Sequence, residues 1–149
     1  MISRILLAIA PLVAAAPDRA HVKKVEEWRA KHESDCRRDW VTVAGLHSLK
    51  PGANTAGSAK SNDIVVSPNV PATIGRFVLD GQRVRFEPQA GVTMQRKDQP
   101  VTTAIDLKDD SQPDADELVI NNVRLVIHLS GDKRSLRVCD STGRRCSYI

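Results

Sequence analysis

Aromatic side chains are scarce in this chain. They make up 3% of its 149 residues, namely Trp28, Trp40, Phe77, Phe86 and Tyr148. Proteins that bind single-stranded nucleic acid stack the bases on aromatic side chains, and other nucleic-acid binders gather their basic residues into one patch. Here the basic pairs are spread along the sequence. We therefore predict no nucleic-acid partner.

The standard catalytic and cofactor motifs are also absent. The sequence has no Gly-x-Ser-x-Gly, no phosphate-binding Gly-x-x-x-x-Gly-Lys, no His-Glu-x-x-His and no dinucleotide-binding Gly-x-Gly-x-x-Gly. It has no Cys-x-x-Cys, which argues against a redox motif and a zinc knuckle. We predict no cofactor, no metal and no catalytic residue, and we leave enzymatic activity open while favouring a non-enzyme.

The one long apolar run lies at the N-terminus. Arg4 precedes an apolar stretch over residues 5–16, which is shorter than the ~20 residues needed to span a bilayer. A positive residue, an apolar run and small residues after it are typical of a secretory signal peptide. With Val13 and Ala15 at the −3 and −1 positions, we predict a signal peptide over residues 1–15. The mature protein is then periplasmic or secreted, with no stable membrane insertion.

Three cysteines remain after that cleavage: Cys36, Cys139 and Cys146. An odd number in an oxidising compartment indicates one disulfide and one spare thiol. Cys139 and Cys146 flank a stretch with turn residues, so this pair is a possible disulfide. The state of Cys36 stays open.

The rest of the chain predicts one helix followed by strands. Val22, Val25 and Trp28 recur at helical spacing within residues 18–36. After them, short apolar or alternating runs are bounded by Gly, Pro, Asn and Asp, which indicates strands and hairpins. Asp80-Gly81 and Asn121-Asn122 predict two tight turns. We predict that residues 16–149 form a single, mainly β domain: a β-sandwich of about nine short strands with one N-terminal α-helix. The expected strands are 40–43, 64–66, 76–79, 83–87, 92–95, 103–107, 118–120, 123–129 and 135–139.

A histidine within an apolar run and a cluster of acidic residues are the two candidates for a titratable or metal-binding site. His128 alternates with Ile127 and Leu129, which predicts a buried or edge histidine satisfied by a hydrogen bond and not a catalytic base. The segment 106–117 holds six carboxylates, a set of oxygen ligands that calcium could use. Its spacing does not match an EF-hand loop, so we predict a solvated acidic loop.

The stretch from Gly57 to Val66 is a polar turn that leads into a β-branched strand. It resembles the turn and strand of forkhead-associated domains, which are phosphothreonine-binding β-sandwiches. The resemblance implies a forkhead-associated-like β-sandwich. That family places an Arg beside the Gly and a His in the next loop, where this chain has Ser58 and Val70. Without these groups, phosphothreonine binding is not expected.

A second resemblance covers nearly all of the predicted mature chain. The chain is similar to the bacterial domain of unknown function 1684 at residues 28–29, 40–46, 49–54, 57–66 and 137–140. The function of that family is not established. Its members continue into a second half with Tyr-Asn-Pro and Cys-Pro-x-Pro-Pro stretches, which this chain lacks. The resemblance therefore implies that these residues are the N-terminal part of a longer architecture.

Three functional hypotheses follow. The favoured one is an exported, non-enzymatic β-sandwich module that binds an unidentified ligand or protein through its loops. The alternatives are a remnant of a periplasmic enzyme whose site needs the missing half, and an electrostatic binder of the cell surface. The candidate ligand-binding residues lie around the first Gly turn: Trp40, His47, Asn54, Ser58, Asn62 and Asp63.

Overall fold

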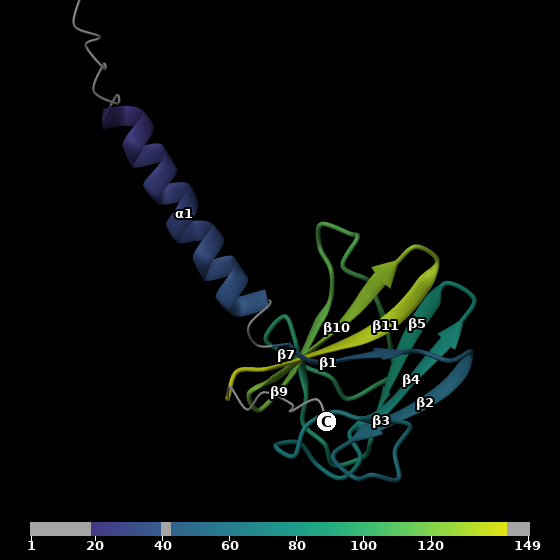
Figure 1. Cartoon of the computed structure of the whole chain (residues 1–149). Coiled ribbons are helices and arrows are strands. Elements are labelled where there is room, and N and C mark those ends of the chain that lie inside the picture. Colours follow the sequence, from purple (N-terminus) through teal and green to yellow (C-terminus); the bar gives the residue numbers. More distant parts are fainter. Residues whose placement is uncertain (1–18, 40–42, 143–149) are drawn as a thin grey trace, which may run out of the picture. The chain divides into compact units, whose positions relative to one another are not determined.

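The chain divides into two compact units, and the second unit begins at Asp35. The computed structural model describes residues 19–39 and 43–142, except the side chains of 37–39. Figure 1 shows a helix and a β unit made of two sheets. The predicted signal peptide, Trp40 and Cys146 lie outside the described residues.

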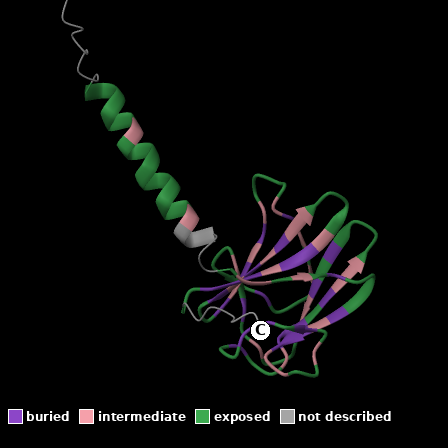
Figure 2. Cartoon of the chain, viewed as in Figure 1, coloured by how far each residue is buried: buried purple, intermediate pink, exposed green. Residues whose placement is uncertain are grey.

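Most of α1 (Arg19–Asp39) belongs to the first unit, and the helix ends five residues past the boundary. It confirms the predicted helix and extends it by three residues. Lys23 and Glu27 form an i,i+4 ion pair, and the indole of Trp28 stacks on the His32 ring with 5.0 Å between centroids. Almost all described side chains of α1 are exposed (Figure 2). No described helix combines the length and the apolar character needed to cross a bilayer.

The β unit is a sandwich of two sheets, as the sequence predicted. The six-stranded sheet has the order β1-β11-β10-β9-β6-β7, and the five-stranded sheet has the order β3-β2-β4-β5-β8. All neighbours are antiparallel except β2 and β3. The bounds are β1 Val43–Ser48, β2 Gly52–Gly57, β3 Ile64–Val65, β4 Gly75–Asp80, β5 Arg83–Pro88, β6 Gln95–Arg96, β7 Gln99–Pro100, β8 Ile105–Leu107, β9 Glu117–Ile120, β10 Val123–Ser130 and β11 Lys133–Asp140.

The core lies between the sheets and follows from alternation along the strands. On β10, Val123, Leu125 and Ile127 are buried, while the residues between them are half-buried on the outer face. From the other sheet, Phe77 on β4 and Phe86 on β5 are register partners, and their rings lie 4.8 Å apart. Figure 2 shows buried residues interspersed with half-buried and exposed ones along strands of both sheets.

Two predicted turns are present with the required backbone. Gly81 has φ 57° in the two-residue connection between β4 and β5. Asn121 has φ 52° in the connection between β9 and β10, a conformation that Asn tolerates better than most residues. These turns fix the register of the two hairpins.

The first two strands differ from the prediction. Of the strand expected at 40–43, residues 40–42 lie outside the described residues, and Val43 begins β1 (Val43–Ser48). The strand β2 was not expected, because Gly-Ala-Asn-Thr-Ala-Gly has low β-propensity. Tertiary pairing decides the structure here: β2 pairs with β4 over five residues and with β3 on its other side. The two-residue strand β7 was also missed, so the described residues form eleven strands where about nine were expected.

Candidate functional site

Asn54, a predicted ligand-binding residue, is buried and fully used by the fold. Its Oδ1 accepts from the backbone N–H of Lys50 at 2.9 Å. Its Nδ2 donates to the carbonyls of Lys50, Gly52 and Phe77 at 2.9–3.1 Å. The side chain therefore closes the connection between β1 and β2 and anchors it to β4.

Asn62 and Asp63 hold the turn after β2. Asn62 Nδ2 donates to the carbonyls of Ala59 and Ala72. One Asp63 oxygen accepts from the backbone N–H and the hydroxyl of Thr55, at 2.9 and 2.8 Å. These hydrogen bonds, the backbone one first, lower the pKa of Asp63. Both side chains stabilise the turn, as Asx residues commonly do.

The remaining predicted residues have no ligand-like arrangement in common. Ser58 lies in the same turn, where its backbone N–H donates to Pro71 O at 3.0 Å. His47 lies on β1, half-buried, and burial lowers its pKa. The structure thus groups Ser58, Asn62 and Asp63 in one turn and leaves His47 and Asn54 apart from it. Whether any of them binds a ligand stays a prediction.

The loop before β4 is also tied down by its own polar groups. Ser67 Oγ donates to Asp140 Oδ2 at 2.7 Å, and Asn69 Nδ2 donates to the same oxygen at 3.1 Å. The other oxygen of Asp140 accepts from Thr142. Burial alone would raise the pKa of Asp140, but these hydrogen bonds outweigh it and lower the pKa. The polar side chains at this end of the sandwich therefore serve the fold.

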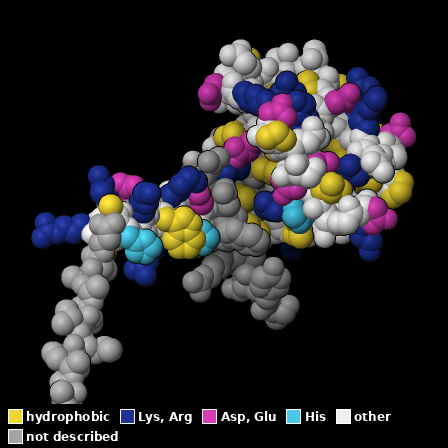
Figure 3. All heavy atoms as spheres, turned by 90° about the horizontal axis from the view of Figure 1, so that it is seen from above, with side chains coloured by type: hydrophobic (Ala, Val, Ile, Leu, Met, Phe, Trp, Pro, Cys, Tyr) yellow, Lys and Arg dark blue, Asp and Glu magenta, His cyan; other side chains and the backbone are white. Residues whose placement is uncertain are grey.

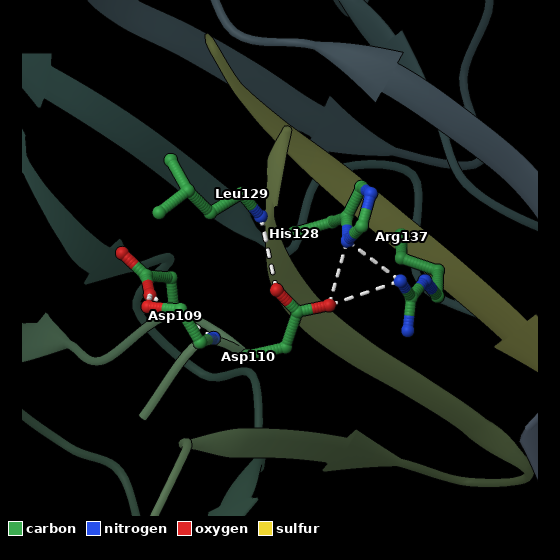
Figure 4. Close-up of polar contacts among 6 residues, drawn as sticks. Asp109, Asp110, His128, Leu129 and Arg137 are labelled. Carbon is green, nitrogen blue, oxygen red and sulfur yellow. Dashed lines mark hydrogen bonds and ion pairs between the residues drawn. The ribbon is translucent and has the colours of Figure 1, made fainter. Parts of the chain in front are cut away.

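At the other end of β10, the acidic segment docks onto the six-stranded sheet. Asp110 takes the place of a neighbouring strand there: its N–H donates to Ile127 O at 2.9 Å, and its Oδ1 accepts from Leu129 N–H at 3.0 Å. Its Oδ2 lies 2.9 Å from Arg137 Nη2 and 2.6 Å from His128 Nδ1 (Figure 4). The predicted hydrogen-bonded histidine is confirmed, and its partner is now known.

The three side chains of Asp110, His128 and Arg137 form a closed triangle, because Arg137 Nη2 also lies 2.7 Å from His128 Nδ1. Burial would raise the pKa of Asp110, but the hydrogen bonds from His128 and Leu129 and the charge of Arg137 outweigh it and lower the pKa. The carboxylate is therefore ionised at neutral pH.

The neighbouring carboxylate, Asp109, makes a second attachment. It is buried, accepts from the N–H and the hydroxyl of Ser111, and lies 3.3 Å from Arg134 Nη2. The prediction of a solvated acidic loop was therefore wrong for this part of the segment. Asp109 and Asp110 together fasten it to β10 and β11.

A cleft of about 380 Å³ opens beside this segment, and we call it the basic cleft. Its lining comes from the start of β5, the β6–β7 turn, the end of β8, the acidic segment and the β10–β11 hairpin. Five cations line it: Arg83, Arg96, Lys97, Lys108 and Arg134. Three carboxylates line it as well: Asp106, Asp109 and Asp116.

Two of the three carboxylates of the basic cleft are withdrawn, whereas its lysines reach solvent; Arg134 is withdrawn with its partner Asp109. The side chains of Asp109 and Asp116 are only 8% and 3% exposed, against 54% for Lys97 and 48% for Lys108. Asp116 accepts from Lys108 N–H and lies 3.6 Å from both Arg96 and Lys97. Asp116 therefore holds these two cations by charge, because the 3.6 Å separation is too long for a direct hydrogen bond.

One cation of the cleft is uncommitted. Within residues 19–39 and 43–142, Arg83 has no ion-pair partner. Figure 3 views the molecule from above and shows Lys and Arg side chains over the sandwich with Asp and Glu between them. The solvent-exposed surface of the basic cleft therefore carries more positive than negative charge, which suits an anion.

The sequence alone did not predict this site. The carboxylates of 106–117 stood out, but nothing pointed to the cations, four of which come from three other segments of the chain. In the described part of the chain, no three His, Cys, Asp or Glu side chains are placed to hold a metal ion. Cys139 is a buried thiol on β11, and its pairing with Cys146 stays a prediction.

Comparison with known proteins shows a structural similarity but no family. No family model matches the chain, and no curated protein matches it. The resemblance to the domain of unknown function 1684 is therefore unsupported. Among solved structures, the chain is similar to Mycobacterium tuberculosis EmbR in complex with a low affinity phosphopeptide, at 18% identity and a TM-score of 0.43. That match covers 90% of this chain and 34% of EmbR, so the chain spans about a third of that protein's length.

Proposed function

We propose that the chain is a non-enzymatic β-sandwich module that binds an anionic ligand in the basic cleft. The observation that carries the proposal is the convergence of five cations from four segments of the chain on one concave surface. Concave sites with a few convergent polar groups are the usual places for ligands. The turn after β2 offers a poorer site, because Asn62 and Asp63 spend their polar groups on the fold.

We also propose that the module acts outside the cytoplasm. The N-terminal pattern over residues 1–15 supports this, since it has the features of a secretory signal. The resemblance to forkhead-associated domains remains compatible with the two-sheet sandwich. It does not extend to phosphothreonine, because Ser58 stands at the position of the family's Arg.

Calorimetric titration of the full chain with citrate and with inorganic pyrophosphate tests anion binding. Binding is expected to weaken as sodium chloride rises from about 50 to about 500 mM, since salt screens exposed charges. The double variant Arg83→Gln/Lys97→Gln is expected to lose affinity about tenfold or more, because it removes two charge-assisted contacts.

The matched control is Lys50→Gln/Lys60→Gln. It changes the net charge equally, but both residues are exposed and lie outside the basic cleft. Its affinity is expected to stay within about twofold of the unmodified chain. Equal losses in both double variants would mean that net charge alone attracts the anion. If neither citrate nor pyrophosphate binds, the proposal is refuted.

A further inference from the structure

Strand β8 is an open edge of the five-stranded sheet. It pairs with β5 through Val84↔Leu107, Arg85↔Asp106 and Phe86↔Ile105. In the described part of the chain, no strand lies on its other side. An open edge has unpaired backbone N–H and C=O groups, which an added strand can satisfy.

This edge belongs to the wall of the basic cleft. Asp106, Leu107 and Lys108 are consecutive, and all three line it. Side chains alternate between the two faces of a strand, so one face of β8 could contribute only every second residue. Asp106 and Leu107 are neighbours within β8, and both line the cleft, which indicates that the backbone edge itself borders it; Lys108 lies just beyond the strand.

The usable edge ends at Lys108. There the chain crosses to the other sheet, where Asp116 N–H donates to Lys108 O at 3.2 Å and Lys108 N–H donates to Asp116 Oδ2 at 3.0 Å. The three residues before this crossing span about 10 Å at about 3.3 Å per residue. A segment of a few residues can pair along that length.

Cations surround the edge on both sheets. Arg83 begins β5, the neighbour of β8, and Lys108 follows β8 directly. Arg96 and Lys97 belong to the six-stranded sheet and its β6–β7 turn, on the other wall of the cleft. In an extended peptide, every second side chain points the same way, about 7 Å apart. Carboxylates at alternate positions would therefore meet these cations while the backbone pairs with β8.

We propose that the ligand of the basic cleft is an extended acidic peptide segment that adds as a strand to the open edge of β8. This inference rests on the proposed anion-binding function and names its ligand class. Main-chain hydrogen bonds supply affinity in strand addition, and the alternate side chains supply specificity. Here Arg83, Arg96 and Lys97 select carboxylates, while Lys108 is ion-paired with Asp114.

The test uses the full chain and a five-residue probe with Glu at its odd positions and Val at its even positions, acetylated and amidated. Two methylated forms carry N-methyl groups on all Glu or on all Val residues. Backbone N–H groups of alternate residues point to the same side of a strand. One methylated form is expected to bind at least tenfold more weakly than the parent peptide, and the other within about twofold.

Three results overturn the inference. The first is that the two methylated forms bind equally, whether both match the parent or both lose affinity. The second is that the parent peptide fails to bind while citrate or pyrophosphate binds in the basic cleft, and this result leaves the proposed anion-binding function intact. The third is that neither the peptide nor the small anions bind, in which case the proposed function fails as well.

Discussion

Replacing Gly57 by alanine is expected to destabilise the β unit by about 3 kcal/mol or more, within the upper range for inserted atoms in packed sites. A Cβ at this position would lie 2.1 Å from Ala72 O and 2.7 Å from Thr73 Cα. Both obstacles are backbone atoms, held by the hydrogen bonds from Ser58 N–H and Ala59 N–H to the carbonyls of Pro71 and Ala72. The strain therefore cannot be relieved by rotating a side chain. Urea denaturation followed by far-ultraviolet circular dichroism measures the loss.

Gly45→Ala is the matched control. Its Cβ would meet His47 Nε2 at 2.7 Å, which is the far end of a side chain that can rotate away. Both glycines lie on strands outside the left-handed region, so backbone conformation does not separate them. The control is expected to cost about 1 kcal/mol or less. Equal costs at the two positions would show that the strand β2 does not approach the 71–73 segment as described.

Asp110→Asn is expected to lower the free energy of unfolding by about 1–3 kcal/mol at pH 7, because it leaves Arg137 without its carboxylate in a partly buried setting. The amide oxygen can still accept from Leu129 N–H, so the loop keeps part of its attachment. Asp132→Asn is the control, since Asp132 lies exposed in the β10–β11 turn. It is expected to change stability by less than about 0.5 kcal/mol.

The stability difference at Asp110 has a defined pH dependence. The folded-state pKa of Asp110 is lowered, so the unfolded chain binds more protons as the pH falls below the unfolded value of about 3.9. Asp110 therefore contributes stability fully above about pH 5, and the contribution is lost as the pH falls through the folded-state pKa. Urea midpoints of the unmodified chain and Asp110→Asn should converge below about pH 4. A gap that stays constant down to pH 2 would contradict the role assigned to this carboxylate.

Local sequence predicted the parts of the fold that local chemistry decides. Alternation located β5, β10 and β11, and the turn residues Gly81 and Asn121 located two hairpins. The strand β2 was missed because its small residues have little intrinsic preference for a strand. Its conformation depends on pairing with β4, which is some twenty residues away in the sequence and invisible to a local pattern.

The candidate site was less predictable than the fold, for the same physical reason. Asn54 and Asp63 attracted attention as polar residues in a distinctive stretch, but hydrogen bonds within the fold account for both. The basic cleft joins Arg83, Arg96 and Arg134, which are unremarkable singly and meet only when the hairpins pack. His128 was correctly expected to be hydrogen-bonded, but its partner, Asp110, was not foreseen.

Amide chemical shifts of the nitrogen-15-labelled full chain, recorded while citrate is added, test the central claim most directly. The account predicts saturable shifts that cluster at residues 82–83, 96–97 and 106–112, on the lining of the basic cleft. Residues 58–63 and 67–74, at the turn after β2 and the loop before β4, should not move. Shifts confined to those two segments would contradict the account, and shifts at 58–63 would return the binding site to Ser58, Asn62 and Asp63, which the sequence first indicated.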